Sequence, residues 1–322
     1  MKLNRRSFIT STTAYAGALS APAIAQSQQI RIIYPFAAGG GGDAVVRYLA
    51  DQMRQALGET IIVENRVGAD GRIGVRAVVN AAPDGRTFLF TPFGPIVTHP
   101  SVYTNLPYNP LKDLQPVAQV ATQEFALSTG PMTTARNLPE LIDWLRANPD
   151  KAAYGSPGAG TIPHFSAILF ATAAKVELRH VPFRGTAPVM NDLAAGQIAL
   201  GSTPAPDAVE LHRAGKVRML ATTGAVRSPL VPDVPTYKEQ GYDIVAQGWY
   251  AIYAPAGTPR PIVDKVSAIL ADAVQKPSGK ELLIRLGQSP TGRSADELAR
   301  IQQADYERWA VPIKASGFKP ED

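Results

Sequence analysis

The chain has 322 residues, of which 45% are hydrophobic and 18% are charged, and its formal net charge is +5. This apolar fraction excludes a wholly disordered chain, and the length suggests about two domains. The chain contains no Cys, which excludes disulfide scaffolds, thiolate zinc sites and Cys nucleophiles.

Residues 1–25 have the form of an export signal. Lys2, Arg5 and Arg6 precede a weakly apolar run that ends in a small-x-small site at residues 23–25. The paired arginines followed by Phe resemble a twin-arginine signal, and a short amphipathic first helix is the alternative. Removing these three charges leaves +5 − 3 = +2. Without a Lys/Arg cluster we expect no nucleic-acid partner, and we expect a soluble, periplasmic mature protein.

Strands and helices alternate through the first part of the mature chain. The expected elements are a strand at 29–36, a helix at 43–57, a strand at 60–63, a helical segment ending at 83 and a strand at 87–91. Asp43 is the expected N-cap of its helix, and Gly58 stands where a C-terminal glycine belongs. This alternation predicts a parallel sheet with helices on both faces.

Strands and helices alternate again in the middle of the chain, and further strands and helices follow towards its end. The expected elements are a helix at 138–148, a strand at 152–155, a helix after a Gly-rich loop at 156–161, a strand at 177–183, a helix ending at 196, a strand at 198–202, a helix ending at 215, strands at 217–222 and 247–254, a helix at 261–274 and a helix opening with Ser294.

A strand, a Gly-rich loop and a helix recur near residues 30–57 and 152–174, which indicates two α/β lobes that face each other. We expect the first lobe to comprise residues 26–124 and 251–322 and the second lobe residues 125–250. Two strand crossings, one near 117–127 and one near 247–254, would join them.

The first Gly-rich loop, residues 39–42, lies between a strand and a helix. Its free N–H groups and the positive end of the helix dipole favour an anion such as a carboxylate. The loop also loosely matches a dinucleotide fingerprint, with Glu64 near the place of a ribose-binding acid, so an NAD-dependent oxidoreductase is the alternative. A purely structural glycine turn is the third interpretation.

The second loop, residues 156–161, offers a strand end, small residues and the start of a helix. Ser156 and Thr161 add hydroxyl donors, and N-capping is the simpler role for either. Two such helix ends on opposing lobes would hold one or two carboxylates between them. Arg184, at a strand-to-helix turn, is either a bidentate carboxylate ligand or a solvated surface cation.

Catalysis is not indicated. Ser156 lacks the first glycine of a nucleophile elbow, and none of the four histidines has a metal-ligand spacing. His164 and His180 are expected to pack or to form hydrogen bonds, and no pair of carboxylates stands out as acid and base. We therefore expect neither a metal nor a cofactor.

Taken together, these stretches resemble the Bug (TctC-like) family of extracytoplasmic solute receptors of tripartite tricarboxylate transporters. The resemblance covers the mature chain in order. The matching stretches are YPFAAGG (34–40), VENRVGA (63–69), APDG (82–85), LPYNP (106–110), YGS (154–156) with Gly160-Thr161 and His164, HVPFRG (180–185), DLAAGQ (192–197), PDVPT (232–236) and APAGTP (254–259).

The resemblance implies a two-lobed, type II-like periplasmic binding protein that closes on a small carboxylate and delivers it to membrane permease subunits. It implies no catalysis, and we expect a monomer. A solute sensor for a signalling partner is a further alternative. The ligand contacts it implies or suggests are Phe36, Gly40, Gly41, Asp43, Thr91, Phe93, Gly94, Ser156, Thr161, His164, Arg184, Gly185, Thr186 and Thr203.

Five residues depart from the family pattern. Gly42 replaces the usual Thr, and Ser202-Thr203 replaces a frequent Phe-Asp pair, which removes a partner for an amino group. Phe93 stands where small or polar residues are common, and Arg184 replaces Lys. These changes favour a ligand with an apolar or aromatic body and one or two carboxylates.

Overall fold

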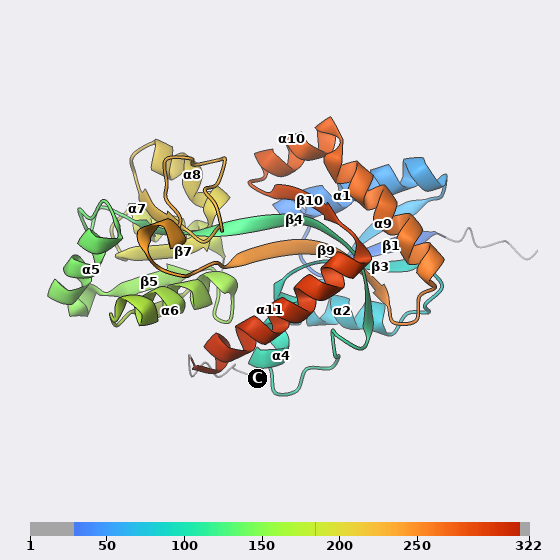
Figure 1. Ribbon diagram of the computed structural model, residues 1–322, viewed down its shortest axis with the longest axis horizontal. Coiled ribbons are helices and arrows are strands. Elements are labelled where there is room, and N and C mark those ends of the chain that lie inside the picture. The colour runs from blue at the N-terminus through green and yellow to red at the C-terminus, as the bar shows by residue number, and fades with distance from the viewer. Residues whose placement is uncertain (1–28, 184, 316–322) are drawn as a thin grey trace, which may run out of the picture.

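One continuous mixed sheet runs through both lobes of the computed structural model, which describes residues 29–183 and 185–315 (Figure 1). The strand order is β2-β1-β3-β9-β4-β7-β5-β6, and β8 and β10 also pair with β4. The strands are β1 (Ile30–Tyr34), β2 (Ile61–Asn65), β3 (Thr87–Pro92), β4 (Leu114–Thr129), β5 (Ala153–Ser156), β6 (Arg179–Pro182), β7 (Leu200–Pro204), β8 (Arg218–Thr222), β9 (Gln247–Pro255) and β10 (Ser289–Arg293).

Strand β4 belongs to both lobes because its two halves pair with different strands. Residues 114–124 pair with β9, whereas residues 125–129 pair with β7. β1 is parallel to β2 and β3, and β5 is parallel to β6 and β7, but every pairing of β4 and β9 is antiparallel. The expectation of a parallel sheet is therefore wrong at the centre, where the two crossing strands run against their neighbours.

The first lobe has helices on both faces of its sheet. α1 and α9 pack on one face, where Val46, Leu49 and Val266 belong to one apolar cluster, and α2 and α11 cover the other face (Figure 1). Gly58 ends α1 in a left-handed conformation, as expected. The helices of this lobe are α1 (Gly41–Leu57), α2 (Arg72–Val79), α3 (Gly94–Val97), α4 (His99–Val102), α9 (Arg260–Gln275), α10 (Pro277–Arg285) and α11 (Ala295–Ala315).

The second lobe repeats this arrangement around its own two apolar clusters. Asn137 is the N-cap of α5, and its side chain accepts a hydrogen bond from Glu140 N. α6 is apolar on nearly all sides and is largely buried, so it serves as the central helix of the lobe. The helices are α5 (Leu138–Ala147), α6 (Ile162–Ala174), α7 (Thr186–Ala194) and α8 (Ala205–Arg213).

The last helix, α11, reaches from the first lobe towards the second (Figure 1). The Trp309 ring lies 6.1 Å from the Phe93 ring of the first lobe and 6.3 Å from the Phe165 ring of α6, measured between centroids. Asp305 accepts a hydrogen bond from Trp249 Nε1 at 3.0 Å. α11 therefore packs against both lobes on one side of the sheet.

The structure corrects one further sequence expectation, adds elements to those predicted and leaves one expectation untested. α1 begins at Gly41 with Gly40 as its N-cap, so Asp43 is not the cap. α10 and β10 were not expected. The proposed export signal lies outside the described residues. No helix in the described ranges is long and apolar enough to span a bilayer.

Candidate ligand-binding cleft

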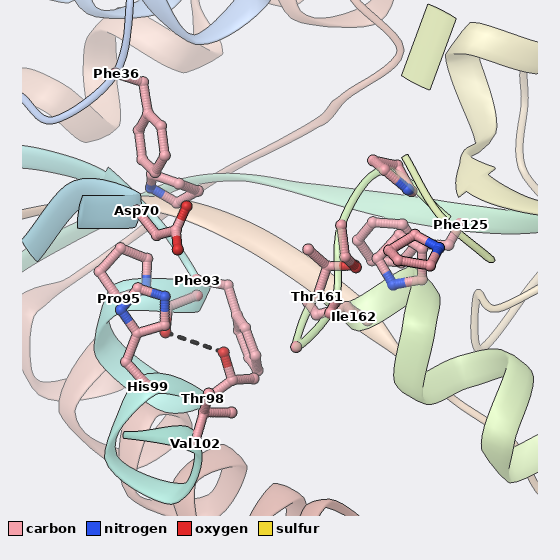
Figure 2. Close-up of a pocket in the computed structure, with 18 of the residues that line it drawn as sticks. Phe36, Asp70, Phe93, Pro95, Thr98, His99, Val102, Phe125, Thr161 and Ile162 are labelled. Atoms are coloured by element: carbon pink, nitrogen blue, oxygen red, sulfur yellow. Dashed lines mark hydrogen bonds between the residues drawn. The ribbon is translucent and has the colours of Figure 1, made fainter. Parts of the chain in front are cut away.

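A cleft of about 790 Å³ opens between the two lobes (Figure 2). One wall comes from the first lobe, the floor from β4, and the other wall from the loop before α6. The lining residues are Phe36, Asp70, Pro92, Phe93, Gly94, Pro95, Thr98, His99, Val102, Tyr103, Gln123, Phe125, Pro157, Gly158, Ala159, Gly160, Thr161, Ile162, Pro163, Pro182 and Phe183. Aromatic rings and prolines dominate this lining, which suits a ligand with an apolar body.

The first-lobe wall includes three of the predicted contacts, Phe36, Phe93 and Gly94. Phe93 is only 2% exposed. Its ring lies edge-on to Trp249, with centroids 5.3 Å apart. Phe93 thus joins the wall to the core of the lobe, while Phe36 is half-buried and offers more of its ring to the cleft.

Asp43 is buried inside the first Gly-rich loop, where every polar contact it makes is internal. Its carboxylate accepts hydrogen bonds from Gly39 N (3.1 Å), Arg47 Nε (2.9 Å) and Asn65 Nδ2 (3.0 Å). The Asn65 amide also donates to Phe36 O at 3.0 Å. These donors, Arg47 foremost, outweigh burial and lower the pKa of Asp43 to about 2. Asp43 therefore fixes the shape of the loop.

The rest of this loop is open to solvent except at one glycine. Gly40 and Gly41 are exposed and do not line the cleft. At Gly42 a Cβ atom would lie 2.2 Å from the Tyr34 hydroxyl, so a side chain here requires Tyr34 to move. That hydroxyl is hydrogen-bonded to Tyr250, and burial raises the pKa of Tyr34 well above its usual range. The Tyr34 hydroxyl thus occupies the space that the side chain of the family's usual Thr would need at position 42.

The opposite wall is the loop that starts α6. Thr161 Oγ1 accepts a hydrogen bond from His164 N at 3.4 Å and donates one to Gly158 O at 2.8 Å, so the N-cap interpretation of Thr161 is confirmed. His164 Nδ1 accepts a hydrogen bond from Gly160 N at 3.0 Å. These contacts hold the loop from within.

Several backbone amides of the same loop remain available. The N–H groups of Ala159, Thr161 and Ile162 have no hydrogen-bond partner among the described residues, and all three residues line the cleft. Amides at the first turn of a helix carry the positive end of the helix dipole. This wall is therefore suited to a carboxylate, which would accept hydrogen bonds from these amides.

Ser156 is held below the loop. Its hydroxyl donates to Gly158 O at 3.0 Å and lies 2.8 Å from His180 Nε2, so the His180 nitrogen is the donor in the second bond. The His164 and His180 rings stack 4.0 Å apart, and burial lowers the pKa of His180 to about 4. Because its proton is committed to a carbonyl, Ser156 is not arranged as a nucleophile for His180.

Two further predicted contacts are fully buried. Thr91 Oγ1 donates to Pro92 O at 3.0 Å. Thr203 Oγ1 lies 3.7 Å from Met190 Sδ in the second-lobe core. His164 is 4% exposed. None of these three predicted residues lines the cleft in the arrangement seen here.

In the turn before α7, Phe183 lines the cleft, but Gly185 and Thr186 do not. Gly185 donates its N–H to Pro157 O at 2.9 Å and so ties this turn to the α6 loop. Thr186 lines a separate hollow of about 270 Å³ together with Asp207, to which its side chain is hydrogen-bonded. Arg184 lies outside the described residues.

The cleft also contains residues that the sequence analysis did not single out: Asp70, His99, Tyr103, Gln123, Phe125 and Phe183. A sequence signal existed for Asp70, which is flanked by Gly68 and Gly71, a pattern typical of unusual backbone. The side chains on β4 carry no comparable signal, because a strand pattern does not show which residue stands at a crossing.

The dinucleotide alternative depends on Glu64 as the acidic residue that binds the ribose. Glu64 accepts hydrogen bonds from Arg66 Nε (3.1 Å) and Nη2 (2.8 Å), and Arg31 Nη1 lies 3.8 Å from its other oxygen. This carboxylate is already paired with two arginines, and Glu64 does not line the cleft. Within the described ranges, no group of three His, Cys, Asp or Glu side chains is arranged to hold a metal ion.

Two lobes around a cleft, a strand shared by both lobes and a helix N-terminus at the cleft wall define a two-lobed solute-binding protein. Residues 45–318 match the family model described as the tripartite tricarboxylate transporter family receptor, TctC. The chain belongs to this family.

Its relatives match over most of their length. BugT of Bordetella pertussis is 31% identical over 91% of this chain and 90% of its own. The structure of Rpa4515 from R. palustris with adipate shares 32% identity, with a TM-score of 0.80 over 91% of this chain and 98% of that one. MatC from Rhodopseudomonas palustris with bound malate shares 31% identity, with a TM-score of 0.75 over 88% and 98%.

Proposed function

We propose that this protein captures a small carboxylate in the periplasm and passes it to the membrane permease of a tripartite tricarboxylate-type transporter. The observation that carries this proposal is the set of unpartnered amides at Ala159, Thr161 and Ile162, at the start of α6 in the cleft wall. Membership of the TctC family supports it, as do the relatives solved with adipate and malate.

The ligand carboxylate binds at the start of α6 and is fixed by backbone donors. Ile162 opens the buried helix α6, Thr161 caps it, and internal hydrogen bonds of Thr161 and His164 hold the loop that carries Ala159, so these amides need little reorganisation when the anion arrives. The ligand body then lies against Phe36, Phe125 and Phe183. This lining favours an apolar or aromatic body, in line with the sequence analysis.

Closure of the lobes completes the site. We assign residues 26–124 and 251–322 to the first lobe and residues 125–250 to the second, and the change of partners along β4 supports this division. Closure would bring the exposed amides of Gly40 and Gly41 towards the ligand and would exclude water, which strengthens its hydrogen bonds. The predicted contacts that lie outside the present cleft are proposed contacts of the closed state.

The proposed function also requires the protein to be exported to the periplasm. The receptor is exported by a cleavable, twin-arginine-like signal at residues 1–25 and acts as a monomer. Replacing Arg5 and Arg6 with Lys should block export by the twin-arginine route. Unchanged export of that variant would contradict this part of the proposal.

A thermal-shift screen tests the proposed function. The ligands are malate, adipate, hexanoate and 3-phenylpropanoate, with NAD as the competing class. A carboxylate at a hundred times its Kd should stabilise the receptor by about 2.7 kcal/mol. Ala159→Pro removes one of these amides and should weaken binding, whereas Ala159→Gly keeps the amide and is the control for loss of the side chain. A shift with NAD alone would contradict the proposal.

A further inference from the structure

A buried histidine in the first-lobe wall has a ring nitrogen without a hydrogen-bond partner in the described part of the chain. His99 is 8% exposed and lines the cleft. Its Nδ1 atom is buried without a partner among the described residues. Burial lowers the pKa of His99 to about 4, so the ring is neutral and carries one donor and one acceptor. Leaving the buried Nδ1 atom unsatisfied costs free energy unless a ligand supplies a partner.

Asp70 stands beside it in an unfavourable backbone conformation. Its φ of 51° and ψ of 38° are left-handed, and the preceding Ala69 has a φ of 46°. Such residues cost about 1 kcal/mol or more each and are retained mainly at functional sites. The Asp70 side chain is exposed and lines the cleft on the same wall as His99 (Figure 2).

Tyr103 joins the two side chains. Its hydroxyl donates to Asp70 Oδ2 at 2.8 Å, and its ring lies edge-on to His99 with centroids 5.0 Å apart. Arg72 covers the other side of Tyr103, with its guanidinium carbon 3.8 Å from the ring centroid. Its Nε donates to Ala69 O at 3.0 Å. The arrangement is thus built from several elements and is held in place without a ligand.

We propose that Asp70 and His99, positioned by Tyr103, form a second recognition site that binds a hydroxyl group on the body of the ligand. This inference rests on the proposed function, which places the ligand carboxylate at α6 on the opposite wall. It names the second functional group, which the family membership leaves open.

The chemistry of the pair selects a hydroxyl group. A hydroxyl donates to the Asp70 carboxylate and accepts from, or donates to, the neutral His99 ring. A second ligand carboxylate would be repelled by Asp70 and has no hydrogen to donate. An ammonium group would meet the positive charge of Arg72 beside Tyr103 and has no lone pair for a ring N–H. The ligand is therefore a hydroxylated monocarboxylate with an apolar body.

Two matched series of ligands test this assignment. The aliphatic series is hexanoate, 6-hydroxyhexanoate, 6-aminohexanoate and adipate, and the aromatic series is 3-phenylpropanoate with and without a para-hydroxyl group. Titration calorimetry should show that the hydroxyl group tightens binding about tenfold in at least one series. Adipate should bind more weakly than 6-hydroxyhexanoate.

Variants separate recognition from stability. Asp70→Gly removes the carboxylate and relieves the left-handed strain, so it should raise the melting temperature while abolishing the preference for the hydroxyl group. His99→Phe should also abolish the preference. Lys175→Gly is the matched control, because Lys175 has a φ of 53° at the end of α6 and does not line the cleft. It should raise stability and leave the preference unchanged.

Each outcome decides between the two proposals. If hexanoate binds but the hydroxyl group adds nothing, the hydroxyl site is overturned and the proposed function stands. Tighter binding of 6-aminohexanoate or adipate than of 6-hydroxyhexanoate also overturns it, as does a preference that survives Asp70→Gly. If no carboxylate binds at all, the proposed function fails and the hydroxyl site falls with it.

Discussion

Glu124→Gln should make the protein more stable above neutral pH. It should also remove most of the fall in the free energy of unfolding that Glu124 causes as pH rises. Glu124 lies opposite Gln247 where β4 passes between the lobes, and it is 9% exposed. Its Oε2 atom is buried with no partner among the described residues. Burial raises the pKa of Glu124 from 4.5 to about 7, against the lowering effect of a hydrogen bond with Gln247.

The sign and size follow from proton linkage. Between pH 4.5 and about 7 the folded protein holds a proton on Glu124 that the unfolded chain has lost, so stability falls as pH rises through this window. The shift of 7 − 4.5 = 2.5 units corresponds to about 3.4 kcal/mol at 1.36 kcal/mol per unit. Relaxation of the surroundings and water penetration around the ionised carboxylate reduce this cost to about 2 kcal/mol.

Urea unfolding at pH 5 and pH 8 measures the effect. Glu124→Gln should match the wild type within about 1 kcal/mol at pH 5 and exceed it by about 2 kcal/mol at pH 8. Glu239→Gln is the control of opposite sign, because hydrogen bonds from Thr236 N and Arg227 lower the pKa of Glu239. It should be destabilising at pH 8. A Glu124→Gln protein less stable than the wild type at pH 8 would refute the reasoning.

Two other substitutions test the first Gly-rich loop. Gly42→Thr places a Cβ atom 2.2 Å from the Tyr34 hydroxyl, so calorimetry should show a loss of about 1–3 kcal/mol, and unchanged stability would contradict the packing described. Asp43→Asn removes the charge that binds Arg47 and Gly39 N, and should cost about 1–3 kcal/mol and speed amide exchange at Gly39. Exchange at wild-type rates would show that Asp43 does not hold the loop.

Much of the architecture could be predicted because its signals are local. The strand, Gly-rich loop and helix around α1 and α6 follow from glycines next to periodic apolar residues. The family assignment, confirmed by the match over residues 45–318, rested on many short motifs in order. The antiparallel centre was not predicted, because the pairing of β3 with β9 joins residues far apart in sequence.

Short helices and strands were not predicted for a different reason. α3 and α4 have four residues each, too few for a helical period to be visible. β10 reads Ser-Pro-Thr-Gly-Arg and has no apolar alternation, so only its pairing with β4 makes it a strand. His99 and Asp70 depend on these unseen elements and on a left-handed turn, which is why sequence analysis missed that wall of the cleft.

The role of Asp43 shows a further limit. Its position in the Gly-rich loop suggested first a helix cap and then a ligand contact. The cap prediction is wrong, and the side chain turns inward to Gly39, Arg47 and Asn65, while the ligand contact stays a prediction. A carboxylate beside glycines reads the same in sequence whether it binds a ligand or its own loop. Only the positions of its donors distinguish the two.

The most direct measurement follows the backbone amides at the start of α6 in the ¹⁵N-labelled receptor while hexanoate is added. Signals of Ala159, Thr161 and Ile162 should move downfield and saturate together, as expected when N–H groups begin to donate to an anion, while exposed Gly215 at the end of α8 stays still. Saturable binding that leaves these three amides unmoved would contradict the account.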